Sequence, residues 1–198
     1  MMSKGSRLLF AIATALLLTS FVAPLWHIAL KAPQYPEGLG MYIWSNQITG
    51  QKPNDLNSIN GLNHYIGMKE IVPESIPELS LMPGVIVGLV LLGLVVAAWG
   101  RRRGLYAWTT IFFAGAVVGL ADFWRWGYDY GHNLKPDAAI KIPGMSYQPP
   151  LIGTKQLLNF QATSLPATAG WIAIGVLLVA VGLSVAEWRR ARQAPAAA

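Results

Sequence analysis

Four long apolar stretches divide the 198-residue chain. They cover about residues 8–30, 82–100, 105–128 and 168–188, and they are separated by segments that are clearly more polar. A helix needs about 17–25 predominantly apolar residues to cross a bilayer. The pattern therefore predicts an all-α membrane protein in which four transmembrane helices make up a single membrane domain over residues 1–198.

Two long connections, residues 31–81 and 129–167, follow the first and the third predicted helix. Structureless loops of this length are uncommon in compact domains and are usually functional when they are ordered. Segments 41–50 (MYIWSNQITG) and 146–160 (SYQPPLIGTKQLLNF) are rich in aromatic and branched residues, unlike disordered chains. We expect both loops to be ordered and to form one compact cap above the helices.

The positions of the charged residues predict the orientation. Only 12% of the residues are charged, and the formal net charge is +6. Eight of the basic residues lie before the first helix, between the second and third helices, or after the fourth: Lys4, Arg7, Arg101, Arg102, Arg103, Arg189, Arg190 and Arg192. Short Arg-rich segments stay in the cytoplasm. Both termini are therefore predicted to be cytoplasmic, and the loops are predicted to face the periplasm from a bacterial cytoplasmic (inner) membrane.

This distribution of the positive charge indicates how the chain is oriented in the membrane. It does not indicate a nucleic-acid-binding surface. The first apolar stretch is long for the h-region of a signal peptide, and Pro24 directly follows its only small-residue cleavage site. We therefore expect the first helix to be retained as an anchor.

The first loop contains a short amphipathic pattern. Apolar residues recur every three positions from residue 56 to residue 65, which predicts a helix of two or three turns. On a continuous helix, His64 and Met68 in the segment LNHYIGMKE (62–70) would share one face. The chain has no cysteine, and imidazole combined with thioether favours copper over zinc, magnesium or calcium. The candidate copper ligands are His64, Met68, Met145 and Met41. The alternative is that His64 and Met68 have only a structural role.

A second polar pattern lies at the outer end of the third helix, in ADFWRWGYDYGHNL (121–134). Asp122, Arg125, Asp129 and His132 follow one another at spacings of three or four, which places them along one helical stripe. The stripe is either an interfacial ion-pair network or a site that receives the protons of a quinol. We find no nucleophile–base pattern, phosphate loop or CxxCH haem motif. The sequence therefore does not predict an enzyme and offers no catalytic residues, and copper is the only candidate metal.

Three segments resemble a known family: APQYPEGL (32–39), LNHYIGM (62–68) and IPGMSYQPPLIGTKQLLNF (142–160). They are similar to segments of the NosB-like small polytopic membrane proteins, whose genes accompany the Sec-exported (clade II) type of nitrous oxide reductase. The resemblance covers both long loops and the four-helix layout. It implies an accessory subunit that docks this periplasmic copper enzyme and supports its assembly, its copper maturation or its electron supply.

The resemblance does not assign any established ligand residues to this chain. Two alternatives therefore stay open beside it. One is a quinol-binding electron-entry module built on the stripe from Asp122 to His132. The other is a stand-alone copper-binding membrane chaperone.

Overall fold

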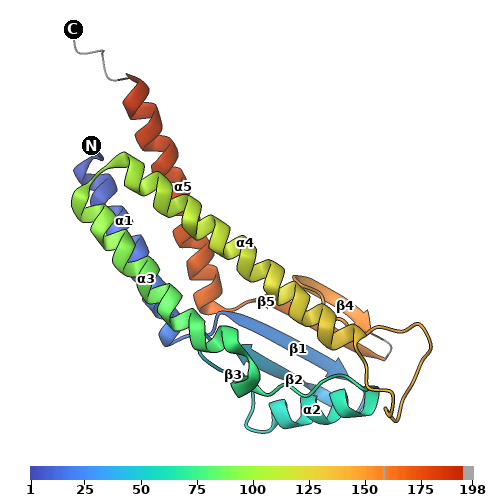
Figure 1. Cartoon of the computed structure of the whole chain (residues 1–198). Helices are drawn as coiled ribbons and strands as arrows, with labels where there is room; N and C mark the ends of the chain where they lie inside the picture. The colour runs from blue at the N-terminus through green and yellow to red at the C-terminus, as the bar shows by residue number, and fades with distance from the viewer. Residues whose placement is uncertain (158, 194–198) are drawn as a thin grey trace.

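The protein has two structurally different ends (Figure 1). The computed structural model describes residues 1–157 and 159–193. Four long helices make up one end, and a five-stranded sheet with a short helix makes up the other. The N-terminus and the end of the last long helix both lie at the end of the bundle that is distant from the sheet (Figure 1).

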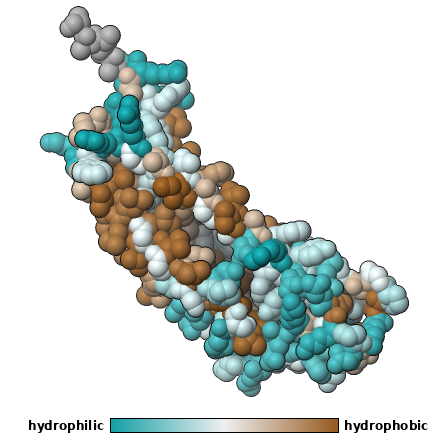
Figure 2. Space-filling view, viewed as in Figure 1, coloured by the Kyte–Doolittle hydropathy of each residue, from teal (hydrophilic) through white to brown (hydrophobic). Residues whose placement is uncertain are grey.

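The four long elements are α1 (Lys4–Leu16) with its 3₁₀ continuation η1 (Leu17–Phe21), α3 (Pro77–Trp99), α4 (Arg102–His132) and α5 (Thr168–Gln193). All four are long and apolar enough to cross a membrane. Figure 2 shows an apolar band over these helices, with hydrophilic surface at both ends of the molecule. The prediction of four membrane-spanning helices agrees with this arrangement.

An aromatic pair holds the helix bundle together. The ring of Phe10 on α1 meets the ring of Trp108 on α4 edge to face, with a centroid distance of 5.0 Å. The indole Nε1 of Trp108 also donates a 2.8 Å hydrogen bond to the carbonyl of Leu89 on α3. Gly93 allows the close approach, because a Cβ atom there would lie 2.4 Å from the Thr14 side chain. Three helices therefore meet around one buried indole.

A buried carboxylate closes the bundle at the end opposite the sheet. The side chain of Glu187 on α5 is completely buried. It accepts hydrogen bonds from the backbone N of Ser3 (3.1 Å), the hydroxyl of Ser6 (2.7 Å), Nε of Arg102 (2.9 Å) and Nη1 of Arg190 (2.8 Å). Since these donors come from α1, α4 and α5, the carboxylate links three of the four long helices.

The prediction of an all-α protein was wrong. The described chain contains an antiparallel sheet with the strand order β3-β2-β1-β5-β4. Its strands are β1 (Trp26–Ala32), β2 (Tyr35–Ile43), β3 (Ile48–Gly50), β4 (Gly153–Leu157) and β5 (Phe160–Pro166). The sheet is built from both long loops and from the end of the first apolar stretch, so the ordered cap exists but is a sheet covered by helices.

The error began in the first apolar stretch. Its helical part ends at Phe21, and residues 26–32 form the central strand β1 instead of the end of a membrane helix. A short apolar run is compatible with either structure, and periodicity alone does not distinguish them. Strand β1 pairs with β5, which lies in the second long loop. No local sequence pattern therefore predicts this pairing.

The two faces of the sheet differ in polarity. Ile28 of β1 lies beside Met41 of β2 and Ser164 of β5, and this row is buried. The alternate row on the other face places His27 beside Tyr42, with ring centroids 4.7 Å apart. Such alternation is typical of an antiparallel sheet with one face on a core and one face in water.

Helix α2 (Asp55–Ile66) covers part of the buried face, and its existence confirms the predicted amphipathic helix. The buried carboxylate of Asp55 accepts hydrogen bonds from the backbone N of Gly40 (2.9 Å) and of Lys52 (3.2 Å). The side-chain amide of Asn60 pairs with the backbone N and carbonyl of Ile71. These contacts fix α2 to β2 and to the chain that returns, through η2 (Pro73–Ser75), to α3.

Replacing Glu187 by Ala should destabilise the whole bundle. The change leaves Nε of Arg102 and the Ser3 backbone N without their acceptor, at a cost of about 2 kcal/mol, whereas Arg190 keeps the hydroxyls of Ser3 and Ser6. Thermal unfolding in detergent measures this loss as a lower Tm. The matched control is Arg189→Ala, because Arg189 is exposed on the same turn of α5. Equal Tm values for the two variants would contradict the structural role of Glu187.

Candidate functional site

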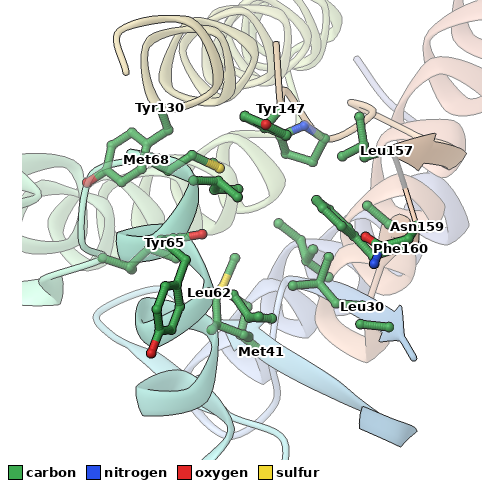
Figure 3. Close-up of a pocket in the computed structure, with 18 of the residues that line it drawn as sticks. Leu30, Met41, Leu62, Tyr65, Met68, Tyr130, Tyr147, Leu157, Asn159 and Phe160 are labelled. Atoms are coloured by element: carbon green, nitrogen blue, oxygen red, sulfur yellow. The ribbon is translucent and has the colours of Figure 1, made fainter. Parts of the chain in front are cut away.

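An apolar cavity of about 220 Å³ lies inside the cap (Figure 3). Its floor is the buried face of the sheet, where Ile28, Leu30, Met41 and Ala162 line it. These residues come from three adjacent strands, and the alternation of the strands turns all four side chains to the same face. The sheet therefore supplies one continuous apolar wall.

The opposite walls come from the two helices that cover the sheet. Helix α2 contributes Ile59 and Leu62, and the chain that follows it contributes Met68. Helix α4 contributes Trp126 and Tyr130, whose ring centroids are 4.2 Å apart. Figure 3 shows Tyr130, Met68 and Tyr147 on one side of the space, with Leu30 and Met41 across from them.

The segment between α4 and β4 closes the cavity. The backbone N of Tyr147 donates a 2.9 Å hydrogen bond to the carbonyl of Gly131 on α4. A Cβ atom on Gly131 would lie 2.4 Å from the backbone N of Gln148. The absence of a side chain at Gly131 thus lets this segment cross α4 closely and bring Tyr147 and Pro149 into the cavity wall.

The cavity is lined by neutral groups. Within the described part of the chain, none of the residues that line it is charged. Three lining residues carry side-chain amides: Gln34, Asn63 and Asn159. The amide of Asn63 is already used, because its Nδ2 donates to the carbonyl of Lys69.

Two polar atoms of residues that line the cavity are completely buried. They are the hydroxyl of Tyr147 and the indole Nε1 of Trp126. Only 2% of the Tyr147 surface is exposed. Both atoms are fully covered by protein, so neither donor is exposed to the cavity.

The structure separates the predicted copper ligands. Met41 and Met68 both line the cavity. His64 is exposed, on the side of α2 away from Ile59 and Leu62. Helix α2 ends at Ile66, and Gly67 takes a left-handed conformation with φ of 80°, so His64 and Met68 do not share a helical face.

Met145, the fourth predicted ligand, is not among the residues that line the cavity. The described residues also contain no group of three or more His, Asp or Glu side chains that could hold a metal ion. Met41 and Met68 thus line the same cavity from opposite sides, and neither His64 nor Met145 joins them. Copper binding stays a prediction that depends on this pair.

The predicted stripe on α4 lies outside the cavity. Nη2 of Arg125 donates to Asp122 across 2.8 Å, and Asp129 pairs with Lys69 and Asn133. His132 stacks on the ring of Tyr128, with centroids 3.9 Å apart. Since Asp129 reaches Lys69 in the segment after α2, the stripe ties α4 to the first loop. The ion-pair interpretation fits these contacts, and the quinol interpretation of these four residues stays a prediction.

Sequence analysis did not identify the aromatic residues that form the cavity. Trp126 and Tyr130 have a helical spacing of four within the same segment as the charged stripe, and this spacing was the available signal. Tyr147 and Phe160 lie in the segment 142–160, and their rings stack at 6.5 Å. Their meeting with α4 depends on the sheet, which the sequence pattern did not predict.

The three segments that carry the family resemblance surround this one cavity. Residues 32–39 contribute Ala32 and Gln34, and residues 62–68 contribute Leu62 and Met68 among others. Residues 142–160 contribute Tyr147, Pro149, Leu157, Asn159 and Phe160. The sequence matches no protein-family model and no curated protein. The cavity is therefore the best-defined candidate site, on geometric grounds.

Replacing Met41 and Met68 together by Leu tests the copper hypothesis. Leu nearly preserves the volume of Met but removes the thioether, so the fold should be kept. A copper site on this pair would lose its Cu(I) affinity in an anaerobic titration of the purified protein. The control is Met145→Leu, which should bind copper like the wild type. Copper binding that survives the double change would exclude Met41 and Met68 as ligands.

Proposed function

We propose that the protein is a membrane-anchored accessory subunit that docks and supports a periplasmic copper enzyme of the nitrous oxide reductase type. One observation carries the proposal. The three segments that resemble the NosB-like family converge on a single folded cap and line the same cavity. A shared function would require these segments, which are distant in the sequence, to meet at one site.

The proposed location is a bacterial cytoplasmic membrane with the cap in the periplasm. The charge distribution supports this orientation, because the Arg-rich segments lie at the end of the bundle opposite the sheet. Basic segments next to membrane helices stay in the cytoplasm. The Glu187 cluster packs two of these arginines, Arg102 and Arg190, at that same end.

The character of the cap favours binding over catalysis. Its cavity is apolar, and its charged groups on α4 are used in ion pairs with one another or with Lys69. The cap is also rigidly connected to the membrane part, since β1 follows α1 and η1 closely and β5 leads directly into α5. A subunit of this kind would hold a soluble enzyme at the membrane surface while that enzyme is assembled or supplied with electrons.

Cysteine labelling tests the proposed orientation, because the chain has no cysteine of its own. Asn57→Cys places a thiol on the exposed side of α2, and Arg189→Cys places one at the other end of the molecule. In cells with a permeabilised outer membrane, an impermeant maleimide should label Asn57→Cys at once. Arg189→Cys should react only after lysis. The reverse pattern would overturn the orientation.

Co-purification tests the proposed partner. The tagged full-length chain, extracted from native membranes in mild detergent, should retain the exported copper enzyme, identified by its copper content and by mass spectrometry. Gly131→Ala should weaken this association, because a Cβ atom there collides with the backbone of Gln148 and displaces the cap segment.

Gly127→Ala is the matched control for that experiment. It lies one turn earlier on α4, and a Cβ atom there meets nothing within 4 Å. If the wild-type protein retained no copper enzyme, the proposed function would be wrong. Equal recovery with both glycine variants would show that segment 142–152 does not take part in docking.

A further inference from the structure

The cavity opens at the end of the cap that is farthest from the membrane helices. The lining residues that are exposed are Gln34, Tyr65, Ile140 and Asn159. Gln34 lies in the turn after β1 and Asn159 in the turn before β5, and β1 points away from the helix bundle (Figure 1). The backbone N of Ile140 donates a 2.9 Å hydrogen bond to the carbonyl of Tyr65 near the end of α2. The rim of the cavity therefore faces away from the apolar band of the molecule.

The cavity is long and narrow. On β1 its lining runs from Ile28 to Ala32, about 13 Å at the rise of a strand. On α2 it runs from Ile59 to Ile66, about 10 Å at the rise of a helix. A volume of about 220 Å³ spread over this length suits a chain better than a compact ring system. Since a cavity of about 150 Å³ holds the six carbons of benzene, this one holds a chain of about nine.

The interior of the cavity offers no partner for a polar group. None of the described lining residues is charged, and the amide of Asn63 already donates to the carbonyl of Lys69. The hydroxyl of Tyr147 and the indole N–H of Trp126 are covered by protein. Burial of a polar group without a hydrogen bond is costly, and burial of an unpaired charge costs far more. The part of a ligand that lies inside the cavity must therefore be hydrocarbon.

A lysine lies beside the cavity on the edge strand β4. Lys155 pairs with Ala162 and stands two positions before Leu157, and both of these residues line the cavity. The pleat therefore turns Lys155 towards the same face of the sheet. Its Nζ donates a 3.3 Å hydrogen bond to the carbonyl of Gln148, next to Pro149 in the cavity wall. An ammonium group has three donors, so this exposed side chain is able to bind an anion as well.

The surrounding chain adds positive charge at the rim. Residues 133–167 contain three lysines, Lys135, Lys141 and Lys155, and a single acidic residue, Asp137. Lys141 directly follows Ile140 of the rim, and the backbone N of Lys135 donates to the carbonyl of Gly67 at the end of α2. An apolar interior with a cationic rim fits a ligand that has a hydrocarbon chain and an anionic head group.

We propose that the cavity binds a free carboxylic acid with an unbranched chain of about nine carbons. The chain fills the apolar interior, and the carboxylate stays at the rim, where Lys155 binds it. The free acid is favoured over a phospholipid of the bilayer, because the rim lies at the end of the cap opposite the membrane helices. The inference concerns ligand binding alone and does not depend on the proposed copper-enzyme partner.

A chain-length series tests the size of the cavity. The full-length protein in phosphatidylcholine nanodiscs is titrated calorimetrically with saturated carboxylates from pentanoate to dodecanoate, and the heats of empty nanodiscs are subtracted. The affinity should rise about fourfold for each added methylene, because each is removed from water, and should level off at about nine carbons. Partition into lipid would give a rise that continues to dodecanoate, and this result would overturn the proposal.

Lys155→Gln tests the contact with the carboxylate. The dissociation constant of nonanoate should rise about threefold, as expected for the loss of an exposed ion pair. That of 1-nonanol, which carries no charge, should be the same in the variant and the wild type. The matched control is Lys31→Gln, because Lys31 lies between Leu30 and Ala32 on β1 and is thus turned to the opposite face of the sheet. Unchanged nonanoate affinity in Lys155→Gln would contradict the proposal.

A second pair of variants shows whether the chain lies inside the cap. Ala162→Leu adds bulk to a fully buried position in the cavity wall and should abolish binding of nonanoate. Ala29→Leu is the matched control, because Ala29 lies on the neighbouring strand but on the opposite face of the sheet. It should bind nonanoate like the wild type. If Ala162→Leu does not fold, the chain-length series and Lys155→Gln still decide.

The remaining outcomes concern other occupants of the cavity. If a bilayer phospholipid filled it, nonanoate would find no space in phosphatidylcholine nanodiscs. Heats equal to those of empty nanodiscs would therefore overturn the proposal, and so would unchanged binding to a folded Ala162→Leu variant. The co-purification experiment is read separately, so loss of one proposal leaves the other standing.

Discussion

The pairing of β1 with β5 is the interaction on which the rest of the cap depends. It runs from Trp26 opposite Pro166 to Lys31 opposite Gln161, and it joins the end of the first apolar stretch to the second long loop. The same ladder is anchored in the membrane part, because the backbone N of Ala167 donates to the carbonyl of Leu25. Gly170 permits this contact, since a Cβ atom there would lie 2.2 Å from the Leu25 oxygen. Backbone hydrogen bonds therefore connect the edge of the sheet directly to the start of α5.

Helix α4 gives this sheet its cover. It has 31 residues, longer than a membrane span requires, and its outer end continues over the buried face of the sheet. One side of that end carries the ion pairs that reach Lys69, and another side carries Trp126 and Tyr130 towards the sheet. Because bulky rings rather than a close backbone contact bridge α4 and the sheet, space for a cavity remains between them. The candidate site thus results from the length of one helix and from the aromatic residues along one of its sides.

Several polar side chains of this cap form hydrogen bonds with backbone groups. Asp55, Asn60 and Asn63 each satisfy backbone groups that secondary structure leaves unpaired. Ser164 accepts from the indole of Trp26 and donates to the carbonyl of Leu151. The hydroxyl of Tyr147 is an exception, because it is buried without a hydrogen-bond partner among the described residues.

The sequence by itself determined the four long apolar helices, their charge asymmetry and the short helix α2. These features depend on local periodicity, and helical hydrogen bonds join residues four apart, so a short window contains the necessary signal. The sheet depended on contacts between residues of different loops, and short apolar runs such as residues 26–32 do not show which partner they will find. The cavity followed from the sheet, and with it the placement of Met41, Met68, Tyr147 and Trp126 around one space. Only the tertiary structure decided that His64 turns to the surface, because a left-handed glycine at position 67 ends the helix that would have aligned it with Met68.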